Sequence, residues 1–216
     1  MRARPSDVRV VLPIFPLPDL TFFPHTLQPL HIFEARYRAM ILDAMARDRR
    51  LALVKLRPGY EATYAGKPAV DLVAGAGEIV NWERLATGRS NILVRGDCRI
   101  RIAQELPTDT LYRIVIAERL EDIPAATDVG RWLARIREAC AWLLRAVNRP
   151  ADFLDSVLAD GQPPGVLADR IASAVLVDPA LRQELLETLD VARRLERLST
   201  ALDDLVNRLG SGRHNE

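Results

Sequence analysis

The chain has 216 residues, of which 49% are hydrophobic and 27% are charged, and its formal net charge is +1. This composition excludes an intrinsically disordered chain and predicts a globular protein of one large or two small domains. The balanced charge weighs against nucleic-acid binding, which usually needs a clustered basic excess. No apolar run in the sequence is long enough for a membrane span, and residues 1–13 lack a signal-peptide core, so we expect a cytoplasmic protein.

The first predicted elements lie in and around a segment rich in proline and phenylalanine, Leu12–Tyr37. Residues 8–12 predict a short strand that ends at Pro13. The prolines of the segment exclude a helix and disfavour a central strand, so we expect an extended, irregular strap whose apolar side chains cover a core. Apolar positions spaced by three and four then predict an amphipathic helix over about 33–47.

Short stretches rich in β-branched residues follow this helix. They predict strands at residues 51–57, 70–80, 92–94, 99–102 and 111–120. Gly88 falls in an expected turn, and Gly96-Asp97 is expected to form a hairpin between two strands. Six or so short strands at this spacing are typical of a small barrel or sandwich.

After Glu121 the apolar pattern changes to a helical period. We predict helices at about 132–147, 151–159 and 167–175, and a last helix that runs from Pro179 to Leu209 along a leucine seam. Such a seam backs an intramolecular bundle or bridges to a second copy of the chain.

These elements group into two expected subdomains. Residues 1–122 would form a strand-rich subdomain with one helix, and residues 123–216 a helical one.

The usual signatures of catalytic and metal sites are missing from the sequence. It holds no phosphate-binding loop, zinc-ligand spacing or nucleophile elbow, so we predict no cofactor and no metal. Cys98 and Cys140 are expected to be buried, reduced thiols.

One acid and one base crowd together near the start of the first helix. There His31 and Glu34 could form an acid–base pair, or could satisfy the unpaired amides of the helix. Arg36 and Tyr37 complete the cluster, and no nucleophile accompanies it.

Three sequence blocks resemble the N-terminal substrate-binding domain of Lon proteases. They are Leu12–Leu17, Phe23-Pro24 and Leu30–Arg38, and the resemblance extends over about residues 8–208. The residues that serve as its structural signature are Pro16, Pro24, His31, Glu34, Arg36, Gly88 and Gly96.

The resemblance implies an α+β fold and a binding function. It implies a β-barrel of the pseudouridine-synthase-archaeosine-transglycosylase (PUA) type, followed by a helical bundle with a long last helix. It further implies a non-catalytic module that binds unfolded or client polypeptides and works with a protease or chaperone, and a homodimer is compatible with the leucine seam. The ATPase and peptidase domains of full Lon proteases are not expected in this chain. The alternative is a binder of small molecules or RNA that uses the barrel cleft.

Four aromatic residues are the expected contacts for a polypeptide partner: Phe22, Phe23, Phe33 and Tyr37. Some of them must instead belong to the core, so their exposure decides which can bind.

Overall fold

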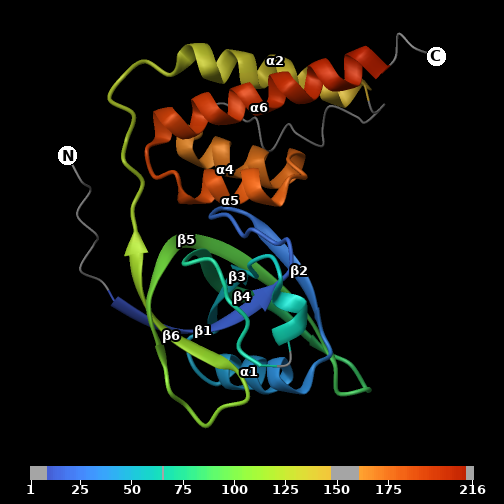
Figure 1. Cartoon of the computed structure of the whole chain (residues 1–216), viewed down its shortest axis with the longest axis vertical. Coiled ribbons are helices and arrows are strands. Elements are labelled where there is room, and N and C mark those ends of the chain that lie inside the picture. The colour runs from blue at the N-terminus through green and yellow to red at the C-terminus, as the bar shows by residue number, and fades with distance from the viewer. Residues whose placement is uncertain (1–8, 65, 147–160, 213–216) are drawn as a thin grey trace. The chain divides into compact units, whose positions relative to one another are not determined.

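The computed structural model describes residues 9–64, 66–146 and 161–212 (Figure 1). Its described residues form two compact units. The first unit combines residues 1–121 with 177–187, and the second combines 122–176 with 188–216. All six strands lie in the first part of the chain, interrupted by one α-helix and one 3-10 turn, and the other described helices follow them, which confirms the predicted α+β class.

The first unit contains one mixed six-stranded sheet. Its strands are β1 (Arg9–Leu17), β2 (Leu27–Ile32), β3 (Arg50–Lys55), β4 (Val73–Arg84), β5 (Ser90–Leu106) and β6 (Arg113–Leu120). Its helices are α1 (Ala35–Met45), the 3-10 turn η1 (Tyr60–Thr63) and α5 (Pro179–Glu187). The strand order is β2-β5-β4-β3-β1-β6, and β6 also pairs with β5. Five strands therefore follow one another in a closed ring of pairings, and β2 extends the sheet beyond β5.

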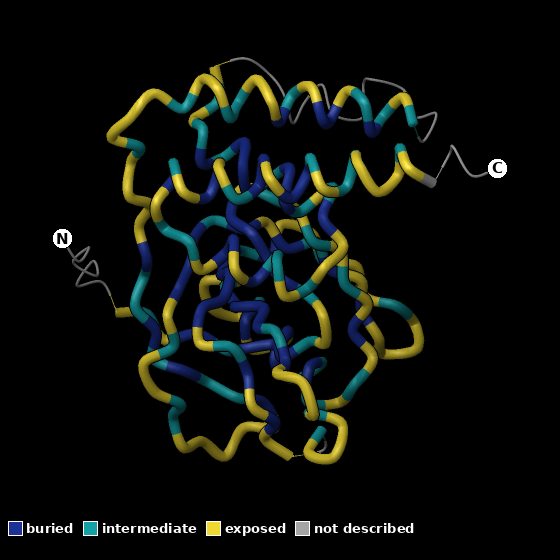
Figure 2. Tube along the Cα trace, turned by 45° about the horizontal axis from the view of Figure 1, so that its top comes forward, coloured by how far each residue is buried: buried dark blue, intermediate teal, exposed yellow. Residues whose placement is uncertain are grey.

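Apolar side chains on both faces of the strands form two clusters. Neighbouring residues of β1 divide between them, since Ile14 belongs to one cluster and Phe15 to the other. The cluster around Phe15 includes the buried face of α1, with Met40 and Ile41. Figure 2 shows buried positions concentrated along the strands, with exposed positions in the connecting loops.

Two prolines lie inside β1, so the strand predicted at 8–12 was too short. β1 pairs with β6 over Arg9–Ile14 and with β3 over Ile14–Leu17. Pro13 and Pro16 therefore each lie where β1 has one paired neighbour. Because a proline lacks only its own N–H, that position can face the unpaired side and no ladder hydrogen bond is lost.

The irregular strap is shorter than predicted and is confined to residues 18–26. The strap ends where β2 begins. Strand β2 contains Pro29 and pairs with β5 alone in the described part of the chain. An edge strand tolerates proline for the same reason. Phe22, Phe23 and Pro24 of the strap are all buried.

The hairpin predicted at Gly96-Asp97 is wrong, because both residues lie inside the single long strand β5. Gly96 instead allows the strap to approach β5: its N–H donates to the carbonyl of Thr26 at 2.9 Å, and its carbonyl accepts the N–H of His25 at 2.9 Å. A Cβ at Gly96 would lie 2.3 Å from the carbonyl oxygen of Phe23. The glycine is thus required by close packing.

The turn predicted around Gly88 is confirmed. It joins β4 to β5, with the Gly88 N–H donating to the carbonyl of Leu85 at 3.0 Å. Gly88 has a φ of 76°, a left-handed conformation that glycine adopts without steric cost.

The second unit is helical. Its described helices are α2 (Gly130–Ala146), α4 (Pro164–Val175) and α6 (Val191–Gly212). At the start of α2 the Asp128 carboxylate accepts the N–H of Gly130 at 2.8 Å, as expected of a cap. The predicted helix at 151–159 lies outside the described residues.

The single long last helix predicted from Pro179 to Leu209 is wrong. The chain forms α5, leaves the helical path at Thr188–Asp190, and starts again as α6. The Asp190 carboxylate accepts the N–H of Arg193 at 3.0 Å, so it caps the new helix. The two parts of the leucine seam belong to different units.

A buried arginine connects three segments of the second unit. Arg194, with 1% of its side chain exposed, forms an ion pair with Asp122 and lies 3.5 Å from Asp169 Oδ1. It also donates to the carbonyl of Thr188 at 3.0 Å. These contacts fix the start of α6 against α4 and against the chain that enters the unit.

Candidate functional site

The four predicted aromatic contacts meet different environments. Phe22, Phe23 and Tyr37 have exposed fractions of 1%, 0% and 4%, whereas Phe33 is 58% exposed. A polypeptide chain cannot pack on the first three rings while the unit is folded. Phe33 is the one member of the predicted set that lies at the surface.

Phe33 continues a row of exposed residues on β2. Leu27, Pro29, His31 and Phe33 alternate with the less exposed Gln28, Leu30 and Ile32. Because side chains alternate between the faces of a strand, the four exposed residues lie on one face of the sheet. We call these four residues the β2 stripe.

A polar ladder crosses three strands beside Phe33. His31 lies opposite Asn91 of β5, which lies opposite Glu83 of β4. His31 Nδ1 is 2.8 Å from Asn91 Oδ1, and Asn91 Nδ2 donates to Glu83 at 2.8 Å. The His31 ring stacks on Phe33 with 6.3 Å between centroids. His31 therefore holds a surface in place and is neither a helix cap nor half of an acid–base pair with Glu34.

Glu34 and Arg36 instead form a cluster with the loop before β4. The Arg36 guanidinium donates to Glu34 Oε2 through Nε at 3.0 Å, and Nη2 lies 2.9 Å from the same oxygen. The Tyr64 hydroxyl donates to Glu34 Oε1 at 2.9 Å. The predicted capping role of the Glu34 side chain is wrong: α1 has no side-chain cap, and the Glu34 carbonyl accepts the N–H of Arg38 at 2.9 Å.

A small cavity is lined in part by Arg36 and Tyr64 of this cluster. It has a volume of about 150 Å³ and is bounded by Pro16 of β1, the start of α1, the loop after β3 and the chain from the end of β5 to the start of β6. Its charged lining residues are Arg36, Lys67, Glu105 and Arg113.

The carboxylate of Glu105 holds two of these cations. Arg113 Nη2 lies 2.8 Å from Glu105 Oε2, and Lys67 Nζ lies 3.2 Å from Oε1. Burial alone would raise the pKa of Glu105, but the hydrogen bonds from Arg113 and Lys67 outweigh it and lower that pKa. Arg113 also donates to the Pro68 carbonyl at 2.8 Å, which fixes the loop to β6.

Tyr37 brings a hydroxyl to the same cavity. Its ring packs on Phe15 with 4.1 Å between centroids, and the Arg36 guanidinium lies 4.6 Å from its centre. Burial raises the pKa of Tyr37 to about 12, although Arg36 and Arg113 act to lower it. The phenol therefore stays protonated at neutral pH and is a hydrogen-bond donor.

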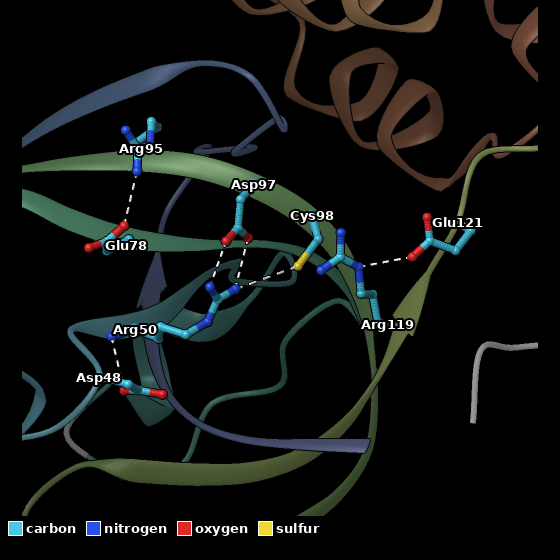
Figure 3. A network of polar contacts seen from close by, with 8 residues as sticks. All are labelled: Asp48, Arg50, Glu78, Arg95, Asp97, Cys98, Arg119 and Glu121. Atoms are coloured by element: carbon cyan, nitrogen blue, oxygen red, sulfur yellow. Dashed lines mark hydrogen bonds and ion pairs between the residues drawn. The ribbon is translucent and has the colours of Figure 1, made fainter. Parts of the chain in front are cut away.

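A second polar network surrounds Cys98 (Figure 3). Arg50 of β3 forms a bidentate pair with Asp97, at 2.9 Å from Oδ1 and 2.6 Å from Oδ2, and its Nη2 lies 3.9 Å from Cys98 Sγ. Burial, followed by the contact with Asp97, raises the pKa of Cys98 to about 12. Burial raises that of Cys140 to about 11. Both thiols stay protonated at neutral pH, so neither is an activated nucleophile.

Neither metal-binding clusters nor membrane spans occur in the part of the chain that the structure describes. No three histidine, cysteine or acidic residues are grouped to hold a metal ion there. None of its helices is both long and apolar enough to cross a membrane.

A family model described as the ATP-dependent protease La (LON) substrate-binding domain matches residues 11–204. The chain belongs to this family. Similar curated proteins include the Lon protease of Desulfosudis oleivorans, 25% identical over 201 residues, and that of Roseiflexus castenholzii, 28% identical over 200 residues. These alignments cover 93% and 92% of this chain but 25% of each relative. The chain therefore spans about a quarter of the length of these proteases.

Two solved Lon domains share the fold. The N-terminal domain of the Mycobacterium avium complex Lon protease has a TM-score of 0.73 at 20% identity, over 90% of this chain and 99% of that one. The Lon N-terminal domain protein from Xanthomonas campestris has a TM-score of 0.63 at 20% identity, over 88% and 96%.

Of the residues that line the cavity of this Lon domain, the sequence pointed to Pro16, Arg36 and Tyr37 and missed the others. Tyr64, Lys67, Glu105 and Arg113 come from a loop and two strands, and no spacing along the chain connects them. Isolated charged residues near strand ends are common on protein surfaces, so these residues do not indicate a site in the sequence.

Proposed function

We propose that the chain is a non-catalytic, polypeptide-binding module, and that the β2 stripe is its contact surface. The observation that carries the proposal is the exposure of Leu27 and Phe33, each 58%, at the first residue of β2 and directly after its last residue. Large apolar side chains that gather on a surface are typical of interaction sites. The family is described as substrate-binding, which supports the same function.

Among the described residues no strand pairs with the outer edge of β2, and this edge suits an extended polypeptide. Because Pro29 has no N–H to give to β5, its position in the ladder is one whose backbone groups face outward. Residues 27 and 31 face the same way, since backbone direction alternates along a strand. An incoming segment can therefore hydrogen-bond to β2 while its apolar side chains pack on the β2 stripe, with Pro29 removing one donor and limiting self-association.

We assign the closed ring of strands to a PUA-like barrel, supported by the pairing of β6 with both β1 and β5. We expect the binding partners to be unfolded client proteins, presented in the cytoplasm to a protease or chaperone. A homodimer stays compatible with the apolar face of α6.

The test is binding of an unstructured peptide by fluorescence anisotropy. The probe is a labelled dodecapeptide of alternating leucine and serine with an amidated C-terminus. Phe33→Ser should weaken binding by about tenfold or more, which is the effect of losing a contact worth about 1.4 kcal/mol or more. Leu42→Ser is the matched control, because Leu42 is 48% exposed on α1, away from β2.

The melting temperature of each variant separates binding from folding. The proposal requires that the Leu42 variant binds like the original chain. Equal losses in both variants, or no binding by the original protein, would refute it.

A further inference from the structure

We propose that the cavity beside Arg36 binds a carboxylate that carries a short apolar group. The carboxylate is either the C-terminus of a polypeptide or a free carboxylic acid. No residue of the β2 stripe lines the cavity, so this site does not depend on the function proposed above.

The charges around the cavity favour one negative charge. Three cations line the cavity: Arg36, Lys67 and Arg113. Two carboxylates pair with them, namely Glu105, which also lines the cavity, and Glu34, which pairs with Arg36. One positive charge is left over among the groups that contact one another. A monoanion would be neutralised there, whereas a phosphate dianion would keep an unpaired charge at a partly enclosed site.

Donors remain available for such an anion. A guanidinium has five N–H groups. Arg36 makes contacts through Nε, Nη1 and Nη2 to Glu34 and the Tyr64 carbonyl, and the last of these is long at 3.4 Å. Arg113 likewise makes three contacts, to Glu105 and the Pro68 carbonyl. Each arginine therefore keeps N–H groups that a carboxylate can use.

The Tyr37 hydroxyl is the most specific feature of the cavity. Tyr37 is only 4% exposed, yet its hydroxyl has no hydrogen-bond partner among the described residues. Its electrostatic neighbours are Arg36, Glu34, Tyr64 and Arg113, so the oxygen lies among the charges of the site. The hydroxyl oxygen is not fully enclosed by protein atoms and borders the cavity, so a bound carboxylate can accept its hydrogen bond in place of solvent.

Size and lining set the rest of the ligand. A volume of about 150 Å³ is smaller than that of most sites for drug-sized molecules, which have about 300 Å³ or more. It accommodates a fragment such as one amino-acid residue. Pro16, Leu56 and Leu111 supply apolar walls, and Leu111 is 68% exposed at the rim. The apolar part of the ligand would lie against these three residues.

Anisotropy with three probes tests the site. A fluorescein-labelled hexapeptide that ends in a free leucine carboxylate should bind, and its C-terminal amide should bind at least tenfold more weakly. Unlabelled N-acetylleucine is the third probe. If N-acetylleucine displaces the labelled hexapeptide only at far higher concentrations than an unlabelled hexapeptide does, the natural ligand is a polypeptide terminus. If both displace it at equal concentrations, the natural ligand is a free acid. Equal affinity for the acid and the amide overturns the proposal.

Two variants locate the binding in the cavity. Tyr37→Phe removes the hydroxyl and keeps the ring on Phe15, and it should weaken the acid about fivefold. Lys67→Met should also weaken it and should lower the melting temperature only slightly, because the Lys67 side chain is 67% exposed and an exposed ion pair contributes little stability. Arg84→Met, which removes a surface cation outside the cavity, should change nothing. Unchanged affinity in both cavity variants overturns the assignment.

The two sites can fail separately. Phe33→Ser should leave binding of the carboxylate hexapeptide unchanged, and Tyr37→Phe should leave binding of the amidated dodecapeptide unchanged.

Discussion

Phe33 and Phe22 are the same residue type in one short segment, yet they play opposite parts. Phe22 is 1% exposed and belongs to the core, whereas Phe33 is 58% exposed. We predict that Phe22→Ala lowers the free energy of unfolding by about 3–5 kcal/mol, the usual cost of emptying a buried aromatic site. Phe33→Ala should cost a few tenths of a kcal/mol, as surface substitutions do. Urea titration of both variants measures the difference, and equal losses would contradict the burial described here.

Glu105 makes the stability of the fold depend on pH. Its folded-state pKa is lowered from the ordinary 4.5 because its contacts with Arg113 and Lys67 outweigh the effect of burial. A carboxylate with a lowered folded-state pKa adds stability above its unfolded-state pKa and loses that stability as the pH falls through the folded-state pKa.

We therefore predict that Glu105→Gln lowers the melting temperature at neutral pH. The gap from the original chain should narrow as the pH drops below about 4.5, since the original chain then loses the same interaction. Melting curves between pH 7 and pH 3 check this. A gap of constant size over that range would show that the ionised form of Glu105 is not what stabilises the fold.

At the scale of single residues, the sequence indicated the family of the chain but not which side chains are buried and which are exposed. The segment Leu12–Tyr37 carries the family resemblance, and its aromatic residues were correctly expected to divide between core and surface. Which of them would be exposed was not predictable, because Phe22 and Phe33 are equally apolar. Only the pairing of β2 with β5 decides that Phe33 follows the exposed face of an edge strand.

Secondary-structure elements were misjudged where a breaker residue has a tertiary role. Pro13 was expected to end a strand and Pro16 to lie in the irregular strap, but β1 exchanges one neighbour for another at Ile14 and so tolerates both. Gly96 was expected to form a turn, but it allows close contact with the strap. Proline and glycine do disfavour regular strands locally, but pairing with strands that lie far away in the sequence overrides this preference.

One residue, Asp190, caps the start of α6 after the break between α5 and α6. Asp190 accepts the N–H of Arg193, and no turn glycine or proline announces the end of α5. We predict that Asp190→Ala costs about 1 kcal/mol, the usual loss on removing an N-cap. Asp190→Asn should cost much less, because asparagine also caps helices. Denaturant unfolding measures both, and equal losses would mean that the cap contributes nothing.

On the scale of the whole molecule, chain order and compact units do not coincide. The division predicted from the sequence at residues 122 and 123 stays a prediction, because it requires each piece to fold by itself. In the structure α5 belongs to the same unit as the sheet. A helical pattern reveals that α5 exists, but it does not reveal which unit α5 joins.

Side-chain hydrogen bonds attach α5 to the strands of the same unit. Arg99 Nε donates to the Leu186 carbonyl at 2.9 Å, and Arg99 is itself only 3% exposed. Gln183 donates to the Val73 carbonyl at 2.9 Å, and Arg182 to the Thr21 carbonyl at 3.1 Å. Without α5, the buried guanidinium of Arg99 loses this partner, and a charge-assisted hydrogen bond contributes about 1.5–3 kcal/mol.

We therefore predict that a chain ended at residue 121 is much less stable than the full chain, although it keeps all six strands. Thermal melting, followed by the tryptophan fluorescence of Trp82, should show a lower midpoint or no cooperative transition. Supplying residues 177–187 as a separate peptide should raise the midpoint, and the same peptide with Gln183 and Leu186 replaced by alanine and proline should raise it less. A truncated chain that melts like the full one would establish that residues 1–121 fold without α5.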